Sequence, residues 1–336
     1  MRNFVRPLRP FAALLVLPLL VITGCSDGGG GSKTASSPSP TSAASPQAVP
    51  TPVPSASPMP TVSGMAGQKA DITLPSGRPS GKFVVSTVSE GTGATVRTSD
   101  WVTIDYTAKD WTTGKAVPSS YDKGQKPQLY QAGTGQLIPA FDASVVGRKV
   151  GSRVLVVAPP AAAFGSKGST ALGVGPDDTL VFVVDILQSV PQNTVLTGHS
   201  VPPPAGMPQV KDNGRKAATI TVPKGQAPPT TLKSAVLIKG TGPKVTSGQT
   251  IVAQYTGALW STGANFDSSW DHGGATAFQI GTGQVIKGWD QGLVGQTVGS
   301  RVLLVIPPSL GYGDQAQDKI PAKSTLVFVI DILQAV

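Results

Sequence analysis

The strongest constraint on how this chain folds is an internal repeat. The segment AGTGQLIPAFDASVVGRKVGSRVLVVAPP, which begins at Ala132, returns as IGTGQVIKGWDQGLVGQTVGSRVLLVIPP from Ile280, and TLVFVVDILQSV returns as TLVFVIDILQAV. Counterparts lie 146 to 149 positions apart, so the first copy is slightly longer in two loops, one of which follows Phe164. A repeat of this period in a chain of 336 residues predicts two related globular domains.

Composition divides the chain into five parts. We predict a signal peptide over residues 1–24, a disordered stalk rich in Ser, Pro and Thr over 25–68, a first domain over 69–190, a Pro-rich linker over 191–210 and a second domain over 211–336. The stalk holds too few large apolar side chains to bury a core, whereas each domain is long enough to do so.

The N-terminus is typical of an exported protein. Arg2, Arg6 and Arg9 precede the apolar run 11–22, which is too short to cross a bilayer comfortably and leads to Cys25 after small residues. The sequence VITGC resembles a bacterial lipobox, so we expect Cys25 to carry lipid and to anchor the chain on the extracytoplasmic side of the bacterial cell membrane. The alternative is that Cys25 is an ordinary residue of a signal peptide.

Charge and residue counts exclude several classes of function. The formal net charge of +9 falls to +6 when the three signal-peptide arginines leave, and the densest remaining group, Arg148, Lys149 and Arg153, has no interleaved aromatic residues. No nucleic-acid partner is therefore expected. His199 and His272 are the only histidines, so no His-based metal site or Ser-His-Asp triad is expected, and no cofactor is expected either.

Apolar patterning within each copy predicts an α+β fold. RVLLVI and TLVFVIDIL are nearly continuous apolar runs bounded by Gly, Pro and Ser, which is typical of buried strands. Ile286, Trp289, Leu293 and Val294 lie on one face of a predicted helix that ends at Gly295. The first copy has the same pattern at Ile138, Phe141, Val145, Val146 and Gly147. We expect each domain to be an antiparallel sheet wrapped around one short α-helix.

The segment FDSSWDHGGATAFQIGTGQVIKGW, from Phe266 to Trp289, places one carboxylate, Asp267, among large apolar side chains with no nucleophile nearby. A second aromatic turn, Gly311-Tyr312-Gly313, follows before the last strand. Together with the flanking IVAQYTG and STLVFVIDIL, these motifs resemble the FKBP family of peptidyl-prolyl cis/trans isomerases from about Thr231 to Val336.

The resemblance implies a fold, an activity and a set of site residues. Asp267, Tyr312 and Trp289 would be the catalytic residues, with Trp289 as the floor of an apolar pocket. The substrate-binding walls would be Tyr255, Phe266, Phe278, Val285, Ile286, Ile320 and Phe328. The implied partners are proline-containing exported polypeptides and macrolides of the rapamycin type.

The second copy departs from the family pattern at two positions. The family often has an arginine five residues after the aspartate, where this chain has His272, and an aromatic residue two positions before Phe278, where this chain has Thr276. A neutral imidazole would hold Asp267 less firmly than a guanidinium group.

The first copy departs further. Val117 and Pro118 stand where the second copy has Phe266 and Asp267, and phenylalanines Phe141 and Phe164 replace Trp289 and Tyr312. The residues that keep an apolar pocket in the first copy are Tyr106, Tyr130, Leu137, Ile138, Val174 and Phe182. Our hypothesis is that the first domain has weak or no activity and serves binding or positioning.

Two functions fit this sequence. The leading one is a lipid-anchored prolyl isomerase that acts on exported polypeptides mainly through its second domain. The alternative is a non-catalytic lipoprotein that uses both domains as peptide- or protein-binding modules.

Overall fold

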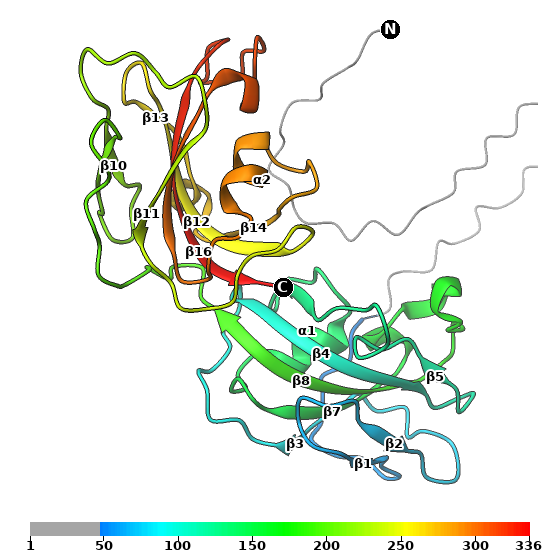
Figure 1. The fold of residues 1–336 in the computed structure, drawn as a ribbon. Coiled ribbons are helices and arrows are strands. Elements are labelled where there is room, and N and C mark those ends of the chain that lie inside the picture. The colour runs from blue at the N-terminus through cyan, green and yellow to red at the C-terminus, as the bar shows by residue number, and fades with distance from the viewer. Residues whose placement is uncertain (1–47) are drawn as a thin grey trace, which may run out of the picture.

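The computed structural model describes residues 48–336 and contains two domains of the same architecture (Figure 1). The predicted signal peptide, Cys25 and the stalk up to residue 47 lie outside the described residues. Within 48–336 no helix has the length and apolar character needed to cross a membrane.

The first domain is a six-stranded antiparallel sheet with one short α-helix, α1 (Pro139–Val145). The strand order is β3-β7-β8-β4-β5, and β6 also pairs with β4. The strands are β3 (Val84–Ser89), β4 (Trp101–Asp110), β5 (Ala116–Val117), β6 (Gln128–Gln131), β7 (Arg153–Ala158) and β8 (Leu180–Val190). Three single 3₁₀ turns, Pro160–Ala162, Gly165–Lys167 and Thr170–Leu172, fill the loop between β7 and β8.

The second domain repeats this sheet in the order β11-β15-β16-β12-β13, with β14 also paired to β12. Its helix is α2 (Lys287–Leu293), and its 3₁₀ turns are η4 (Ser269–His272) and η5 (Pro308–Leu310). The strands are β11 (Lys233–Ile238), β12 (Thr250–Leu259), β13 (Asn265–Ser268), β14 (Thr276–Gln279), β15 (Arg301–Ile306) and β16 (Leu326–Ala335). The predicted α+β fold is confirmed in both copies.

Helix α2 lies close to the sheet because two of its residues have no side chain. A Cβ atom added at Gly288 would come within 2.5 Å of Ile306, and one added at Gly292 within 2.7 Å of Leu304. The helix ends at Leu293, two residues before Gly295, whose φ of +86° suits glycine. The predicted apolar stripe is wrong at Val294, which is the C-cap residue and is 39% exposed.

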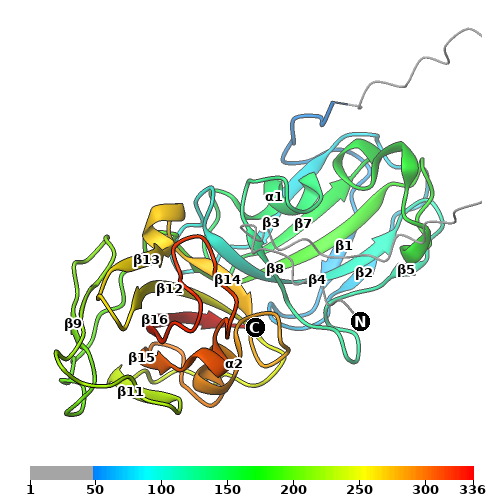
Figure 2. The same cartoon turned by 90° about the horizontal axis from the view of Figure 1, so that it is seen from above.

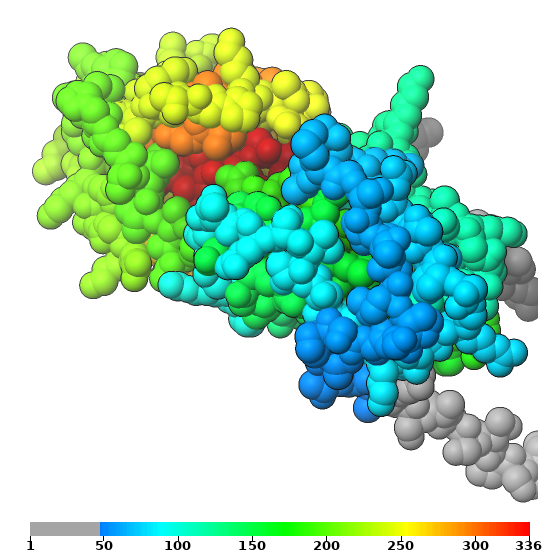
Figure 3. Space-filling view, turned by 90° about the horizontal axis from the view of Figure 1, so that it is seen from below, coloured from blue at the N-terminus to red at the C-terminus, as the bar shows by residue number. Residues whose placement is uncertain are grey.

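Each sheet is covered on its second face by a β-hairpin that precedes it in the chain. In the first domain β1 (Thr61–Ser63) pairs with β2 (Asp71–Thr73), and in the second domain β9 (Gln209–Lys211) pairs with β10 (Thr219–Thr221). The first described residues, blue in Figure 3, spread over the outer surface of the first domain. The sheets are therefore buried on both faces.

These covers explain why the strand sequences are apolar almost without interruption. In β15 and β16 the side chains of Leu304 and Phe328 join the core on the helix side, whereas Leu303, Val305 and Val327 join a second core with Ile220 of the hairpin. Successive strand residues point to opposite faces, so a sheet covered on both sides needs apolar residues at consecutive positions.

The covers also correct two predicted boundaries. The stalk was expected to reach residue 68, but Val53 donates its backbone N–H to Phe83 O at 2.9 Å, and residues 61–63 form β1. In the predicted linker, Val201 donates in the same way to Leu237 O at 2.8 Å. The Pro-rich composition did not indicate that these segments are folded, because their few apolar residues pack on distant strands rather than on one another.

The repeated unit therefore includes the cover. Ala70 N donates to Thr107 Oγ1 at 3.0 Å, and the counterpart Ala218 N donates to Thr256 Oγ1 at the same distance. The hairpin sequences TVSGMAGQKADIT and QVKDNGRKAATIT have diverged more than the sheet sequences have. The relation between the two hairpins is therefore clearer from this shared hydrogen bond than from the sequence.

A buried ion pair lies at the same place in both sheets. Arg153 Nε is 2.7 Å from Asp185 Oδ1, and Arg301 Nε is 2.6 Å from Asp331 Oδ1. Each arginine also binds its hairpin, Arg153 through Gly64 O at 2.8 Å and Arg301 through Asp212 at 2.6 Å. The ion pair thus ties each cover to its sheet.

The two domains meet through a small apolar cluster. Trp101, Val190, Val252 and Ala275 are buried together there, and Trp101 Nε1 donates to Ala275 O at 2.7 Å. Figures 1 and 2 both place the end of β16 at this junction. The segment after β8 contributes as well, because Gln192 O accepts the N–H of Ala275 at 2.9 Å.

Candidate active site

The centre of the candidate site is the indole of Trp289, which α2 presents to the sheet. Trp289 is 4% exposed. Its ring meets three others edge to face, with centroid distances of 5.0 Å to Phe278, 5.3 Å to Phe328 and 5.6 Å to Tyr255. Such aromatic pairs contribute about 0.5–1.5 kcal/mol each beyond burial, so the indole is held firmly as a floor.

The other predicted apolar residues belong to the same cluster. Phe266 packs against Phe328 at a centroid distance of 5.5 Å. Ile320 and Phe328 are buried, and the half-buried members are Tyr255, Phe266, Phe278, Val285, Ile286 and Tyr312. The structure therefore brings together every apolar and aromatic side chain that the family resemblance assigned to the second domain.

Asp267 is held at both carboxylate oxygens. Tyr255 donates its hydroxyl to Oδ2 at 2.7 Å, and His272 Nε2 lies 2.7 Å from Oδ1. The Asp267 side chain is 38% exposed and that of His272 is 56% exposed. His272 thus takes the place at which the family pattern has arginine, and the carboxylate is oriented from two sides.

The two tyrosines of the site remain protonated. Burial, followed by the hydrogen bond and charge of Asp267, raises the pKa of Tyr255 well above its usual range. Burial and then the nearby Asp267 charge also raise the pKa of Tyr312. Both hydroxyls are therefore hydrogen-bond donors at neutral pH, and that of Tyr312 has no protein partner within residues 48–336.

The floor of the site carries one unused donor. Trp289 Nε1 is buried and has no hydrogen-bond partner in the part of the chain that the structure describes. An unsatisfied buried donor costs about 1–3 kcal/mol and is uncommon in a well-packed core. Phe141, the counterpart in the first domain, has no such donor.

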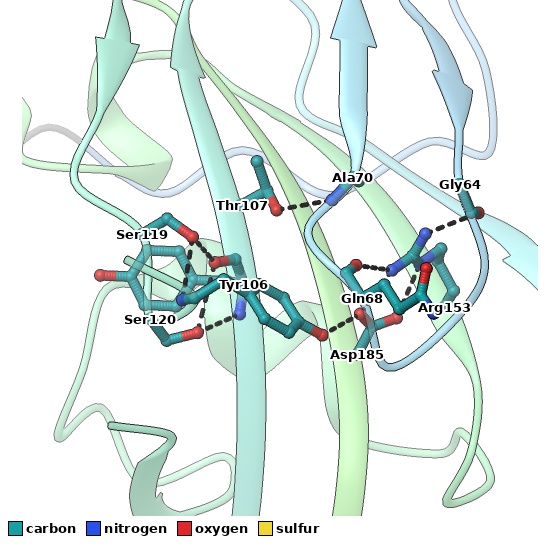
Figure 4. A network of polar contacts seen from close by, with 10 residues as sticks. Gly64, Gln68, Ala70, Tyr106, Thr107, Ser119, Ser120, Arg153 and Asp185 are labelled. Carbon is teal, nitrogen blue, oxygen red and sulfur yellow. Dashed lines mark hydrogen bonds and ion pairs between the residues drawn. The ribbon is translucent and has the colours of Figure 1, made fainter. Parts of the chain in front are cut away.

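Sequence reasoning missed a pair of serines that fixes Tyr255. Ser268 Oγ donates to Tyr255 O at 3.0 Å, and Ser269 Oγ accepts from Tyr255 N at 3.0 Å. Ser119 and Ser120 make the same two bonds to Tyr106 in the first domain, at 2.5 and 2.7 Å (Figure 4). The Ser-Ser pair in PSSYD and DSSWD is the sequence signal that could have revealed this support.

A second missed residue is Gly257, which makes room for Phe266. A Cβ atom at this position would lie 2.6 Å from the Phe266 ring and 2.8 Å from the Phe328 ring. The first domain has Ala108 at the matching place in the sheet, opposite Phe182, and the smaller Val117 in place of Phe266. The wall of the site is therefore set by two coupled positions.

The first domain keeps the aromatic cluster without its polar groups. Phe141 lies 5.1 Å from Tyr106 and 5.2 Å from Phe182, measured between ring centroids. Among the described residues Tyr106 has no carboxylate partner, because Pro118 stands where the second domain has Asp267. Tyr130, Val174, Leu137 and Ile138 pack in the same core.

Residues 48–336 contain no group of three or more His, Cys, Asp or Glu side chains able to hold a metal ion. The site consists of an aromatic floor, one oriented carboxylate and tyrosine donors. This arrangement suits binding of a neutral, partly apolar ligand with a few directed polar contacts.

Comparison with known proteins identifies the same two regions. The family model described as FKBP-type peptidyl-prolyl cis-trans isomerase matches residues 93–187 and 242–333. An FK506-binding protein from Streptomyces anulatus is 45% identical over 111 residues, 32% of this chain and 90% of that protein. FK506-binding protein 2 from Dictyostelium discoideum is 53% identical over 91 residues, 27% of this chain and 68% of its own.

Among solved structures, AtFKBP13 is 40% identical and aligns over 32% of this chain and 96% of its own, with a TM-score of 0.30. The family match covers more than half of the chain and falls once in each domain. The chain therefore belongs to the FKBP-type peptidyl-prolyl cis-trans isomerase family, as an enzyme with two tandem FKBP domains.

Proposed function

We propose that the second domain carries the prolyl isomerase activity and that its clients are exported polypeptides at the outer face of a bacterial membrane. One observation carries the proposal for the second domain: Asp267 is oriented by Tyr255 and His272 beside a floor made by Trp289. The first domain has neither the carboxylate nor the indole at these positions.

The chemistry needs no nucleophile and no proton transfer. Rotation about a peptide bond has a barrier of about 18–20 kcal/mol because it destroys amide resonance. The planar amide is more polar and better hydrated than the twisted one, so a dry aromatic surface favours the twisted form. A thousandfold acceleration requires only about 4 kcal/mol of differential stabilisation.

Each polar residue has a distinct part in this proposal. Trp289 supplies a flat apolar surface for the prolyl ring, and Tyr312 offers a free hydroxyl to a backbone carbonyl of the client. Asp267 presents a fixed negative charge, which disfavours the planar resonance form whose carbonyl oxygen is partly negative. Tyr255 and His272 hold that charge in place.

The proposed location follows from the N-terminal sequence. The signal-like run, the lipobox-like VITGC and Cys25 support export and lipid anchoring. Because the folded cover begins near residue 50, residues 26–47 would form the tether.

The same cluster is our proposed site for macrolides of the FK506 and rapamycin type. The relatives named as FK506-binding proteins support this assignment. His272 and Thr276 border the cluster, so the affinity for these macrolides depends on two positions that differ from the family pattern.

The first domain is proposed to support the second. Trp101 bonds to Ala275 O in the segment between His272 and Phe278, so the contact holds a rim of the candidate site. The position matching Trp101 in the second copy is Thr250, which indicates that the tryptophan serves the junction rather than the shared fold.

A prolyl-isomerisation assay on the full chain tests the proposal. Asp267→Ala and Trp289→Leu should each abolish most of the activity, whereas Phe141→Leu should leave it nearly unchanged. Circular dichroism of each variant controls for folding. If Phe141→Leu abolishes the activity and Trp289→Leu does not, catalysis belongs to the first domain and the assignment is wrong.

A further inference from the structure

The second domain has a hollow on its surface beside the turn η4, separate from the aromatic cluster. Its walls come from the connection between β9 and β10 and from η4. The lining residues are Asn213, Arg215, Lys216, Ala217, Trp270 and Asp271.

The hairpin connection that forms one wall is fixed by several polar contacts. Asn213 Nδ2 donates to Ala217 O at 2.8 Å and to Thr219 Oγ1 at 2.9 Å, and Gly214 N donates to Asp212 Oδ1 at 2.8 Å. Arg301 binds the other oxygen of Asp212 at 2.6 Å. The loop is therefore ordered from within and anchored to the sheet.

The charges on this loop are left unbalanced. Arg215 and Lys216 are exposed, and within residues 48–336 neither forms an ion pair. Asp212, three residues before Arg215, is bound to Arg301. Burial alone would raise the pKa of the Asp212 carboxyl, but the hydrogen bond from Arg301 lowers it below its usual value. Two cations therefore face the hollow against the single carboxylate of Asp271.

At the corresponding place in the first domain the polar side chains are paired with one another. Lys69 Nζ lies 2.5 Å from Asp122 Oδ1, and the hydroxyl of Tyr121, the counterpart of Trp270, donates to Asp185 at 2.5 Å. Arg153 binds both ends of the hairpin turn, at Gly64 O and at Gln68 O (Figure 4). Trp270 has no hydroxyl for the equivalent bond, and the second hairpin keeps its cations unpaired.

We propose that this hollow is a subsite for an acidic side chain of the same polypeptide whose prolyl bond occupies the active site. The inference deepens the proposed function and rests on it. An arginine fork matches carboxylate geometry, and the half-buried Trp270 offers apolar surface for the methylene groups of a glutamate.

The position of the hollow fits one continuous ligand. Asp267 and His272 of the active site lie at the two ends of a six-residue segment that contains Trp270 and Asp271. An extended peptide covers about 3.3–3.6 Å per residue, so a glutamate a few residues from the proline reaches across this segment.

Paired peptides test the subsite with the full chain. Each fluorescently labelled peptide contains one Ala-Pro bond and carries either Glu or Gln at a position two to eight residues before or after the proline. Dissociation constants come from fluorescence anisotropy, and kcat/KM comes from the isomerisation assay. At a favourable spacing we expect the Glu peptide to bind about three- to tenfold more tightly than its Gln partner.

Two charge-matched variants separate a local subsite from general attraction. Arg215→Ser with Lys216→Ser should abolish the preference for Glu and leave binding of the Gln peptides unchanged. Lys233→Ser with Lys239→Ser removes the same charge from exposed residues that do not line the hollow, and should keep the preference.

Equal binding of Glu and Gln peptides at every spacing would overturn the subsite, as would an equal loss of preference in both double variants. A Glu preference in binding without isomerisation of any peptide would instead overturn the proposed function and leave the subsite intact. Isomerisation of Gln peptides at the same rate as Glu peptides, together with equal affinities, would leave the function intact and remove the subsite.

Discussion

The two domains share the same sheet, helix, cover and buried Arg–Asp pair, yet they differ at the candidate site. Both hold their site tyrosine, Tyr106 or Tyr255, with a pair of serines. Only the second domain adds a carboxylate and a tryptophan floor. The comparison separates residues that build an FKBP domain from residues that we expect to act on a ligand.

The differences are also coupled to one another. Ala108 is compatible with Val117 in the first domain, whereas Phe266 requires Gly257 in the second. A change of one wall residue alone would therefore create either a clash or a gap. The loss or gain of a site in such a duplicated protein involves at least two positions of the sheet.

The largest expected effect tests what the domains share. Arg153→Ala and Arg301→Ala each remove the cation that pairs with a buried aspartate, so we expect each to destabilise its own domain by about 3–5 kcal/mol. The free energy of unfolding of each domain is measured by urea denaturation, with hydrogen exchange of the amides of each sheet as the probe. A cost below about 1 kcal/mol in either domain would show that the ion pair is not a common support.

The junction provides the next test, because Trp101 has no equivalent in the second domain. Trp101→Ala removes a buried indole and its bond to Ala275, with an expected loss of about 2–4 kcal/mol in the coupling of the domains. Calorimetry should then show two better-separated unfolding transitions. Leu187→Ala is the control, since Leu187 is 38% exposed, and unchanged transitions in Trp101→Ala would contradict the contact.

The carboxylate distinguishes the domains most directly. Asp267→Ala should lower kcat/KM by about ten- to a hundredfold, because it removes the charge that we propose disfavours the planar amide; this factor corresponds to about 1.4–2.7 kcal/mol of transition-state stabilisation. Asp122→Ala changes an aspartate of the matching turn in the first domain, which pairs with Lys69. Activity that responds equally to both variants would refute the proposed division of roles.

A transplant of the site sharpens the comparison further. We consider the three substitutions Ala108→Gly, Val117→Phe and Pro118→Asp in a chain that already carries Asp267→Ala. They should raise kcat/KM by no more than about tenfold over Asp267→Ala alone, because Phe141 and Phe164 remain in place. Without Ala108→Gly the new phenylalanine would meet a Cβ atom, at a cost of about 1–3 kcal/mol. Equal stability of the two sets, measured by thermal unfolding, would contradict the coupling of these positions.

The smallest effect concerns the imidazole that replaces the family's arginine. His272 is 56% exposed, and exposed pairs contribute at most about 1 kcal/mol, so His272→Ala should lower kcat/KM by no more than about fivefold. His272→Arg should keep the full rate. A loss as large as that of Asp267→Ala would instead assign His272 a direct role.

Much of the fold was predictable because apolar runs and the repeat are local signals. The strands β15 and β16, the helix α2 and the double domain follow from them. The covers were not predictable in this way, since Val53 and Val201 lie in Pro-rich sequence and find their partners on strands far along the chain. The prediction for Val294 is wrong because this residue follows the last helical turn, where its side chain is 39% exposed.

The candidate site was predictable only through family resemblance. No periodicity in the sequence places Phe266, Phe278 and Phe328 around Trp289, because these residues come from different strands. The contact between Asp267 and His272 depends on the tight turn η4, whose geometry no pattern of residue types reports. The repeated serine pair is the exception, a local signal that points to the support of both tyrosines.

The tied covers have a consequence for how the chain assembles. Two similar hairpins precede two similar sheets in one polypeptide, a situation that invites exchange of segments between domains during folding. The polar ties oppose that exchange, since the second sheet's Arg301 would meet Gly64 of the wrong hairpin instead of the carboxylate of Asp212. Divergence of the hairpin turns therefore allows the second sheet to discriminate its own cover from that of the first domain.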